Sequence, residues 1–285
     1  MTSVERFRVG PGTKVKLRDI DPDYHGGHVD KEAATAEVER DLERMAELQY
    51  LLYAENRRSL LICLQGLDAS GKDGTISHVF RGMNPQGIEV AQFKVPTKQE
   101  LAHDFLWRIH QRTPASGRVA IFNRSHYEDV LAARVHQLVP KEVWSSRYDR
   151  INEFEKNLVD AGTTILKFYL HISEDEQLRR FERRLDDPRR QWKISDADYE
   201  ERKFWPDYIE AFEDVFRKTS TSYAPWYVVP ANHKWFRNLT VASVVVETML
   251  SLGLKVPPPS VDIEMIRKKY HAMAKGEHRL EARRR

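Results

Sequence analysis

Short apolar runs alternate with helical patterns along most of the chain. Each run is rich in Leu, Ile, Val or Phe and is bounded by polar residues or turn formers, which is typical of strands. The run at 119–122 is apolar throughout and predicts a strand buried on both faces. Strands that alternate with helices indicate a parallel sheet flanked by helices, and so an α/β fold. The predicted strands are 60–65, 88–93, 119–122, 165–172 and 226–229.

Helices and irregular segments complete this pattern. Apolar residues recur with helical spacing between 30 and 56, and residues 101–110 also read as a helix. The segment 1–29 contains several Pro and Gly residues and predicts an extended arm. A charged tail, 257–285, begins with three consecutive prolines, and the part after them is a helix candidate. We expect one domain over residues 1–285, with the arm and the tail attached to it.

The first predicted strand runs directly into a phosphate loop. Residues 66–72 read GLDASGK, which matches Gly-x-x-x-x-Gly-Lys, and a helix-compatible segment follows. Backbone N–H groups of such a loop surround phosphate oxygens, and Lys72 can reach a bridging or terminal phosphate. The alternative is an ordinary strand, turn and helix in which the glycines serve only the turn. Further residues expected to bind substrate here are Gly66, Ala69, Ser70, Gly71, Asp73, Gly74 and Thr75.

Two aspartates distinguish this loop from the usual one. Ser or Thr normally follows the lysine and binds Mg²⁺, whereas Asp73 stands there and the first hydroxyl belongs to Thr75. A carboxylate within the loop repels phosphate unless a cation lies between them. Asp68 is therefore expected to bind Mg²⁺ or to orient the attacking phosphate. The alternative is an aspartate that caps a turn.

A second polar cluster follows the apolar run at 119–122. Asn123 stands where phosphate-loop enzymes present an acid to the metal at the end of a strand. An amide brings no charge, so the negative ligands are expected to shift to Glu128 or Asp129. Arg124 is placed to hold a phosphate with two donors. For the two carboxylates, the alternative is a favourable charge at the N-terminus of a helix.

A third cluster is rich in arginine. Arg180 and Arg184 are one turn apart on a predicted helix and share a face, which suits a row of phosphates. With Arg190 and Lys193 they predict a mobile lid at about 173–207 that supplies positive charge and excludes water. The alternative is an exposed helix with ion pairs between its own turns.

Composition narrows the classes of function. Among 285 residues, 46 Lys and Arg face 43 Asp and Glu, and the net charge of +3 does not by itself indicate nucleic-acid binding. No apolar run approaches the length of a membrane span, and the first residues do not resemble a signal peptide. The single cysteine, Cys63, lies in a predicted strand and is expected to be buried in a reducing compartment. We expect a cytoplasmic protein that binds neither nucleic acid nor membranes.

Several segments together form a specific combination of motifs: residues 48–55 (LQYLLYAE), 66–74 (GLDASGKDG), 101–108 (LAHDFLWR), 123–129 (NRSHYED), Asp187-Pro188 and Trp192-Lys193. In this combination the chain resembles the polyphosphate kinase 2 family, from about Asp30 to Leu252. Asp73 in place of a hydroxyl fits this family, whereas Asn123 departs from the aspartate of many members. With Asn123 the chain resembles the subgroup of the family that accepts both AMP and ADP.

The resemblance implies a P-loop kinase fold with an Arg-rich helical lid. It also implies reversible transfer of the terminal phosphate of inorganic polyphosphate to AMP or ADP, giving ADP or ATP. Mg²⁺ or Mn²⁺ and a homo-oligomer, a dimer or a tetramer, are expected on the same ground. The expected catalytic residues are Asp68, Lys72, Arg124, Arg180 and Arg184. Asn123, Arg190 and Lys193 are expected to bind substrate, and Asp68, Glu128 and Asp129 to hold the metal.

Two other functions fit parts of the sequence. An ATP-dependent nucleotide kinase of the thymidylate or adenylate kinase type shares the fold and the loop but uses ATP as donor. A nucleotide-sensing or polyphosphate-binding module shares the loop and would bind tightly without turnover. Donor choice separates the first of these from a polyphosphate-dependent kinase, and turnover separates the second.

Overall fold

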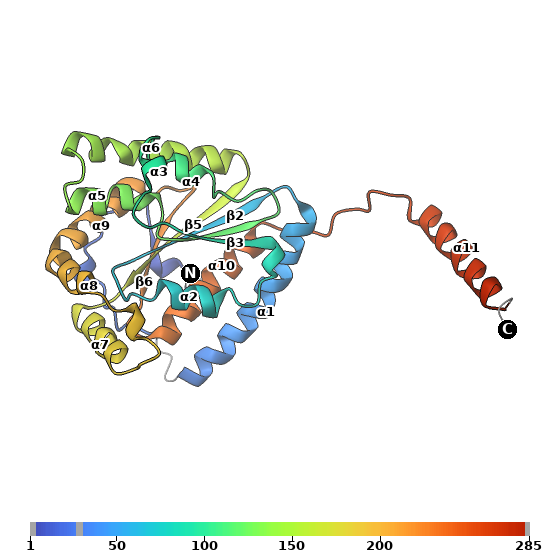
Figure 1. Cartoon of the computed structure of the whole chain (residues 1–285), viewed down its shortest axis with the longest axis horizontal. Helices are drawn as coiled ribbons and strands as arrows, with labels where there is room; N and C mark the ends of the chain where they lie inside the picture. The colour runs from blue at the N-terminus through green and yellow to red at the C-terminus, as the bar shows by residue number, and fades with distance from the viewer. Residues whose placement is uncertain (1–3, 27–30, 283–285) are drawn as a thin grey trace. The chain divides into compact units, whose positions relative to one another are not determined.

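The structure, a computed structural model, describes the backbone of residues 4–26 and 31–282. Within those ranges the protein contains a central sheet of six strands (Figure 1). The strands lie in the order β1-β6-β5-β2-β4-β3. Their bounds are β1 Arg8–Val9, β2 Ser59–Gln65, β3 Ile88–Gln92, β4 Val119–Asn123, β5 Thr163–His171 and β6 Trp226–Pro230. The five strands that the sequence predicted are confirmed.

All pairs among β2 to β6 are parallel. Leu61 of β2 lies opposite Ala120 of β4 on one side and Ile165 of β5 on the other. The short strand β1, in the N-terminal segment, adds an antiparallel pair at the edge, where Arg8 lies opposite Tyr227. Parallel strands end at the same edge of a sheet, so the segments that follow β2, β4 and β5 converge there.

Helices cover both faces of the sheet. Their bounds are α1 Lys31–Glu55, α2 Lys72–Val79, α3 Lys98–Leu101, α4 Trp107–His110, α5 Ala132–Val135, α6 Lys141–Asp160, α7 Glu174–Leu185, α8 Asp196–Glu201, α9 Trp205–Thr219, α10 Lys234–Ser251 and α11 Ile263–Ala282. The predicted helix between 30 and 56 is confirmed as α1. Two single-turn 3₁₀ helices also matter for the site, His126–Asp129 and Gln191–Lys193.

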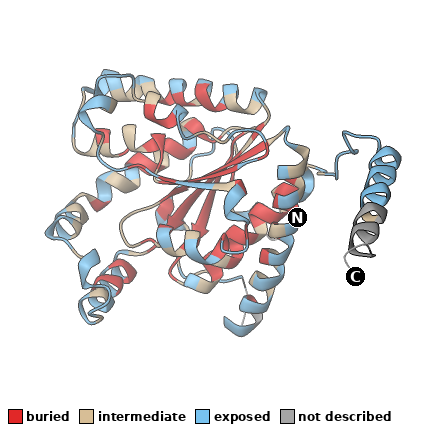
Figure 2. Ribbon diagram, turned by 45° about the vertical axis from the view of Figure 1, so that its right-hand side comes forward, coloured by how far each residue is buried: buried red, intermediate tan, exposed pale blue. Residues whose placement is uncertain are grey.

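Alternating side chains of β2 serve two separate cores. Leu60 and Ile62 pack with α1, α2 and α10, whereas Leu61 and Cys63 pack on the side that α6 covers. This period of two is the geometry of a strand with both faces buried, and every residue of β2 is buried (Figure 2). Cys63 is fully buried, as expected.

The helix predicted at 101–110 is wrong as one continuous element. Helix α3 ends at Leu101 and α4 begins at Trp107. Between them Asp104 Oδ1 accepts a hydrogen bond from the backbone N–H of Leu106, at 3.0 Å. An aspartate that bonds the backbone two residues later favours a turn over a helix interior.

By its internal contacts the chain divides into two compact units, Met1–Leu254 and Lys255–Arg285. The first contains the sheet, and the second contains α11. In the part of the chain that the structure describes, no helix is both long enough and apolar enough to cross a membrane.

Candidate active site

The phosphate loop joins β2 to α2, and its backbone leaves no room for side chains at two glycines. Gly66 and Gly71 adopt positive φ angles of 149° and 108°. A Cβ on Gly66 would lie 2.6 Å from Ser70 Oγ and 2.9 Å from the carbonyl oxygen of Leu170. Both positions therefore require glycine, as in loops whose backbone N–H groups surround phosphate oxygens.

Lys72 begins α2 and lies over the loop. Its Nζ donates to the carbonyl oxygens of Gly66, at 2.7 Å, and Leu67, at 3.3 Å. Burial, together with the charge of Arg124, lowers the pKa of Lys72 to about 8. The ammonium group is thus close to the loop and poorly solvated, which makes an anion in the loop a favourable partner.

Arg124 and Asp68 lie side by side, although they are far apart in the sequence. Arg124 Nη2 donates to Asp68 Oδ1 at 2.8 Å, and its Nη1 lies 3.6 Å from Glu128 Oε2. Ala69 and Arg124 both have left-handed backbone angles, with φ of 60° and 62°. Such angles in residues other than glycine cost about 1–3 kcal/mol each and cluster at functional sites.

Asp73 connects the loop both to the sheet and to residues 173–207, the segment that the sequence predicts as a lid and that we call the lid. Asn123, at the end of β4, donates from Nδ2 to Asp73 Oδ1 at 2.7 Å. Lys193, in the 3₁₀ turn of the lid, lies with its Nζ 3.8 Å from Asp73 Oδ2. The structure therefore brings together three residues that were expected to bind substrate.

Arg180 is buried and contacts the loop through backbone carbonyl oxygens. Its Nη1 donates to the carbonyl oxygens of Ala69 and Ser70, both at 2.8 Å, and its Nε donates to Glu176 Oε1 at 2.8 Å. Only 5% of the residue is exposed. The sequence placed Arg184 on the same face of the helix as Arg180. In the structure the two side chains have different partners, because Arg184 Nη1 lies 3.9 Å from Asp198 Oδ2 on α8.

Arg190, the remaining lid cation expected at the site, is exposed and pairs within the lid. Its Nε lies 3.0 Å from Asp187 Oδ2. Of the four lid cations predicted from the sequence, Arg180 and Lys193 thus contact loop residues and the other two contact lid residues.

The three expected metal ligands do not form one group. Asp68 and Glu128 both face Arg124, whereas Asp129 accepts from Arg147 Nη1 and lies 3.7 Å from Arg108. Within the described residues, no three His, Cys, Asp or Glu side chains are arranged to hold a metal. Of these three expected ligands, Asp68 belongs to the loop and Glu128 lies next to Arg124, the residue that contacts Asp68. Oxygen ligands of this kind suit Mg²⁺ or Mn²⁺.

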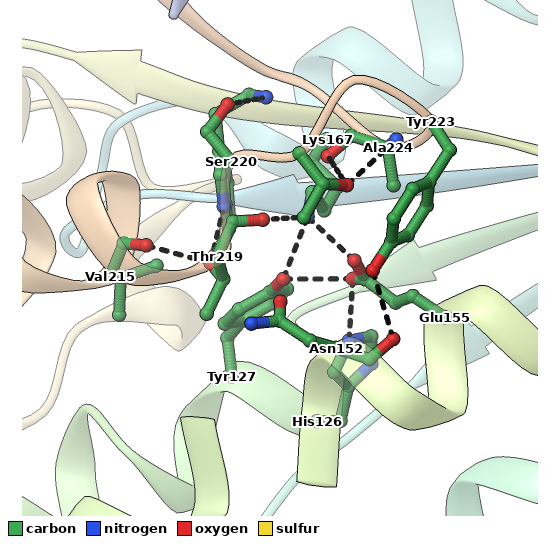
Figure 3. A network of polar contacts seen from close by, with 12 residues as sticks. His126, Tyr127, Asn152, Glu155, Lys167, Val215, Thr219, Ser220, Tyr223 and Ala224 are labelled. Atoms are coloured by element: carbon green, nitrogen blue, oxygen red, sulfur yellow. Dashed lines mark hydrogen bonds and ion pairs between the residues drawn. The ribbon is translucent and has the colours of Figure 1, made fainter. Parts of the chain in front are cut away.

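A buried polar network anchors the segment that carries Arg124 and Glu128 (Figure 3). Lys167 Nζ, in the middle of β5, donates to Glu155 Oε2 at 2.7 Å, to Tyr127 Oη at 2.9 Å and to the carbonyl oxygen of Thr219 at 2.7 Å. Glu155 Oε1 accepts from Tyr127 at 2.8 Å. Burial opposes ionisation of Glu155, but Lys167 and His126 together more than compensate and lower the pKa of the carboxyl.

Sequence reasoning missed three residues of the site. Gln177 Nε2 donates to the carbonyl oxygen of Asp68 at 2.8 Å. Burial, and next the charge of Asp68, raise the pKa of Asp198. Arg237, in the first turn of α10, lies against Gly71. Asp198 also completes a capping box with Ser195, so its position in the sequence suggested only a role in capping the helix. An arginine within the mainly apolar helix α10, by contrast, could have indicated Arg237 as a functional residue.

Known proteins resemble this chain over most of its length. Residues 28–253 match the family described as polyphosphate kinase 2. An AMP/ADP-polyphosphate phosphotransferase of Meiothermus ruber is 51% identical over 92% of this chain and 99% of its own. An ADP-polyphosphate phosphotransferase of Rhodopseudomonas palustris is 45% identical over 89% of this chain and 92% of its own.

A solved structure agrees with this assignment. The crystal structure of polyphosphate kinase 2 from Arthrobacter aurescens matches with a TM-score of 0.90 and 42% identity, over 94% of this chain and 96% of that one. The P-loop kinase fold expected from the sequence is confirmed. The chain belongs to the polyphosphate kinase 2 family.

Proposed function

We propose that this protein is a kinase that transfers the terminal phosphate of inorganic polyphosphate to AMP and ADP, reversibly. The observation that supports this most strongly is the 51% identity, over 92% of the chain, to a protein named AMP/ADP-polyphosphate phosphotransferase. A phosphate loop followed by Asp73, with its carboxylate bonded to Asn123, accompanies that likeness.

The reaction breaks the bond between the terminal phosphorus and the bridging oxygen of polyphosphate and forms a bond from that phosphorus to an oxygen of the acceptor phosphate. The second pKa of a phosphate monoester is about 6, so the acceptor oxygen is largely ionised at neutral pH and no residue has to remove a proton from it. The protein has to align two polyanions and neutralise their charge.

The residues around the loop divide this task. Lys72 and the backbone N–H groups of the loop would hold the transferring phosphate. Arg124 would bind the acceptor phosphate, and Asp68 would set the orientation of the guanidinium through the bond at 2.8 Å. The same carboxylate keeps Arg124 in place before substrate arrives.

The lid would supply further positive charge. Arg184, Arg190 and Lys193 can exchange their carboxylate partners for phosphate oxygens, because none of them is fully buried. Arg180 has a different role, because its Nη1 already donates to loop carbonyl oxygens, its Nε to Glu176, and its Nη2 to the carbonyl oxygens of Ala231 and Asn232. We assign it to holding the shape of the loop.

Asp68 and Glu128 would hold Mg²⁺ or Mn²⁺, which supplies charge neutralisation between donor and acceptor phosphates. Asp129 is left out of this set because Arg108 and Arg147 surround it. Because the amide of Asn123 carries no charge, these two carboxylates would supply the negative charge of the metal site.

Three further features belong to the proposal. A cytoplasmic location fits a kinase that consumes adenine nucleotides and has one buried, unpaired cysteine. The proposed partners are small polyanions, without nucleic acid or a membrane. We also propose a homo-oligomer, a dimer or a tetramer, because of the family resemblance.

ATP formation with polyphosphate as the only donor tests the function. Purified protein would be incubated with long-chain polyphosphate, Mg²⁺ and either AMP or ADP, and the products separated by chromatography. We expect ATP from ADP, and ADP followed by ATP from AMP. Lys72→Met is the matched control because it removes the ammonium group and keeps most of the side-chain volume.

The other outcomes identify the alternatives. ATP from ADP alone would retain the polyphosphate kinase and remove AMP as acceptor. No product with polyphosphate, together with transfer from ATP to a nucleoside monophosphate, would indicate an ATP-dependent nucleotide kinase. Tight binding of polyphosphate or nucleotide without any transfer would indicate a binding module.

A further inference from the structure

Arg237 is a buried cation at the base of the phosphate loop that the proposed mechanism does not use. It lies in the first turn of α10, the helix that packs beside α2, and only 2% of the residue is exposed. A Cβ on Gly71 would overlap with Arg237 Nη1, and one on Gly74 would lie 3.3 Å from Nη2. The guanidinium therefore fills the space that these two glycines leave.

No carboxylate pairs with this guanidinium among the residues that the structure describes. Its Nε and Nη2 donate to the side-chain oxygen of the next residue, Asn238, at 3.1 and 2.7 Å. Glu176, the carboxylate that pairs with Arg180, also accepts a hydrogen bond from Arg183. A buried arginine without an anion is costly, so its retention calls for a reason.

Two further features make the position unfavourable for a cation in the free protein, and the pKa of Arg237 reflects the environment. The N-terminal end of a helix carries partial positive charge. A Cβ on Gly71 would lie 3.6 Å from Arg180 Nη1, so two guanidinium groups border the same glycine. Burial, followed by the charge of Arg180, lowers the pKa of Arg237 to about 9.

The positive charge extends from Arg237 toward the lid. Lys234, one turn earlier on α10, has a lowered pKa because of its burial and the charges of Arg180, Arg183, Arg237 and Arg190. An anion on the loop would relieve the mutual repulsion of these groups. The free-energy cost of holding these cations close together is therefore present in the free protein and is reduced when phosphate binds.

We propose that Arg237 is a positioning residue of the phosphate loop: it supports Gly71 and Gly74 from the α10 side and holds an uncompensated positive charge behind the loop, which strengthens the binding of phosphate groups. This inference deepens the proposed function and rests on it for the identity of the polyanion. It makes the unusual prediction that removal of the charge weakens substrate binding without weakening the free fold.

Arg237→Met and Arg237→Lys test this proposal. Thermal unfolding would be followed without ligand and with long-chain polyphosphate, and kcat and KM would be measured for ATP formation from ADP. For Arg237→Met we expect an unfolding temperature at or above that of the wild type without ligand, and a smaller increase when polyphosphate is added. We expect kcat/KM for polyphosphate to fall about tenfold or more, and Arg237→Lys to restore a large part of it.

Arg58→Met is the matched control. Arg58 precedes β2 at the opposite end of the strand from the loop, is partly buried, and forms two bonds of 2.8 Å to Glu55. We expect this variant to lose stability without ligand and to retain kcat/KM. The two methionine variants should therefore lose different properties: Arg237→Met loses kcat/KM but not stability, and Arg58→Met loses stability but not kcat/KM.

Several results would overturn the proposal. An Arg237→Met protein that is unfolded, or less stable without ligand, would show that the arginine serves the fold. An undiminished response to polyphosphate with normal kcat/KM would show that its charge does not act on the loop. A wild-type protein that makes no ATP would contradict the proposed function instead, and the thermal response to polyphosphate would still decide the role of Arg237.

Discussion

Asn123 holds Asp73 through a hydrogen bond of 2.7 Å from Nδ2 to Oδ1. This bond joins the end of β4 to the start of α2, at the position where other phosphate loops place a hydroxyl. It accounts for the presence of an amide at 123, since an amide donates to a carboxylate and a second carboxylate cannot.

Asn123→Asp is predicted to weaken this junction. It removes the donor and places two carboxylates against each other, so we expect a loss of about 1 kcal/mol in the free energy of unfolding, reduced from a buried value because Asp73 is largely exposed. Urea unfolding measures the change. Asp73→Asn in the same protein should recover most of it, and equal losses in the single and double variants would contradict the coupling.

The activity is predicted to decline above about pH 8. Lys72 has a pKa of about 8 in the free protein, so it loses the charge that attracts phosphate as the pH rises through that value. kcat/KM for polyphosphate should then fall as the pH increases, by up to tenfold per pH unit. Bound phosphate favours the charged form, and kcat should therefore decline at a higher pH.

The stability of the free protein should change in the opposite direction. The unfolded chain keeps the proton of Lys72 up to its ordinary pKa of 10.5, whereas the folded protein releases it near 8. Between these values the unfolded state binds more protons, so the free energy of unfolding gains a positive contribution as the pH rises. Urea unfolding of wild type and Lys72→Met at pH 7.5 and 9.5 measures this contribution; a difference that is the same at both values would contradict it.

Asp68→Asn is predicted to reduce kcat about a hundredfold or more with the fold intact. The variant removes the charge that orients Arg124 and one expected ligand of the metal. Steady-state kinetics and circular dichroism measure the two properties. If Asp68 acts through Arg124, the variants Arg124→Ala and Asp68→Asn should not be additive in a double-mutant cycle, and near-normal turnover by folded Asp68→Asn would refute the assignment.

Lys193→Ala is predicted to affect catalysis but hardly stability. Its ion pair with Asp73 spans 3.8 Å and is solvent-exposed, so the free energy of unfolding should change by less than about 1 kcal/mol. We expect a higher KM for polyphosphate because the lid loses one cation above the loop. Lys203→Ala is the control, since Lys203 pairs with Glu200 on the exposed lid surface; equal kinetic effects of the two variants would contradict a specific role.

The buried network is predicted to be sensitive to the loss of either charge alone. Glu155→Gln or Lys167→Met leaves the other charge unpaired at a fully buried position, which costs about 3–5 kcal/mol. Chemical denaturation measures the loss, and replacing both residues by Leu and Met should cost less than the sum. Because the pKa of Glu155 is below its ordinary 4.5, its contribution is present above that pH and is lost as the pH falls through the lower, folded value.

The sheet and the loop could be predicted because their signals are local. A strand such as β2 is apolar along its whole length, and the loop requires glycine at fixed spacings for backbone reasons. The two short helices between residues 98 and 110 could not be predicted as separate elements in this way. There the side chain of Asp104, which accepts a hydrogen bond from the backbone N–H of Leu106, competes with a weak helical pattern and interrupts it.

Which polar residues meet depends on tertiary structure. Helical spacing placed Arg180 and Arg184 on one face, but the loop carbonyls bind the first and α8 binds the second. Likewise Asp129 follows Glu128 directly, yet Arg108 and Arg147 draw it away from the loop. The spacing of residues along the chain predicts which face of a helix a side chain lies on. The residues that it contacts there belong to other elements, which the spacing does not identify.

The amino-acid sequence by itself determined the α/β order, the phosphate loop and the chemical class of the substrate, because each depends on neighbouring residues and backbone geometry. Only the tertiary structure decided which cations face the loop. Arg237 reaches Gly71 from a helix more than 160 residues later in the chain, and no local pattern encodes a contact at that separation. Long-range packing makes it, because the carboxyl ends of the parallel strands bring the flanking segments together.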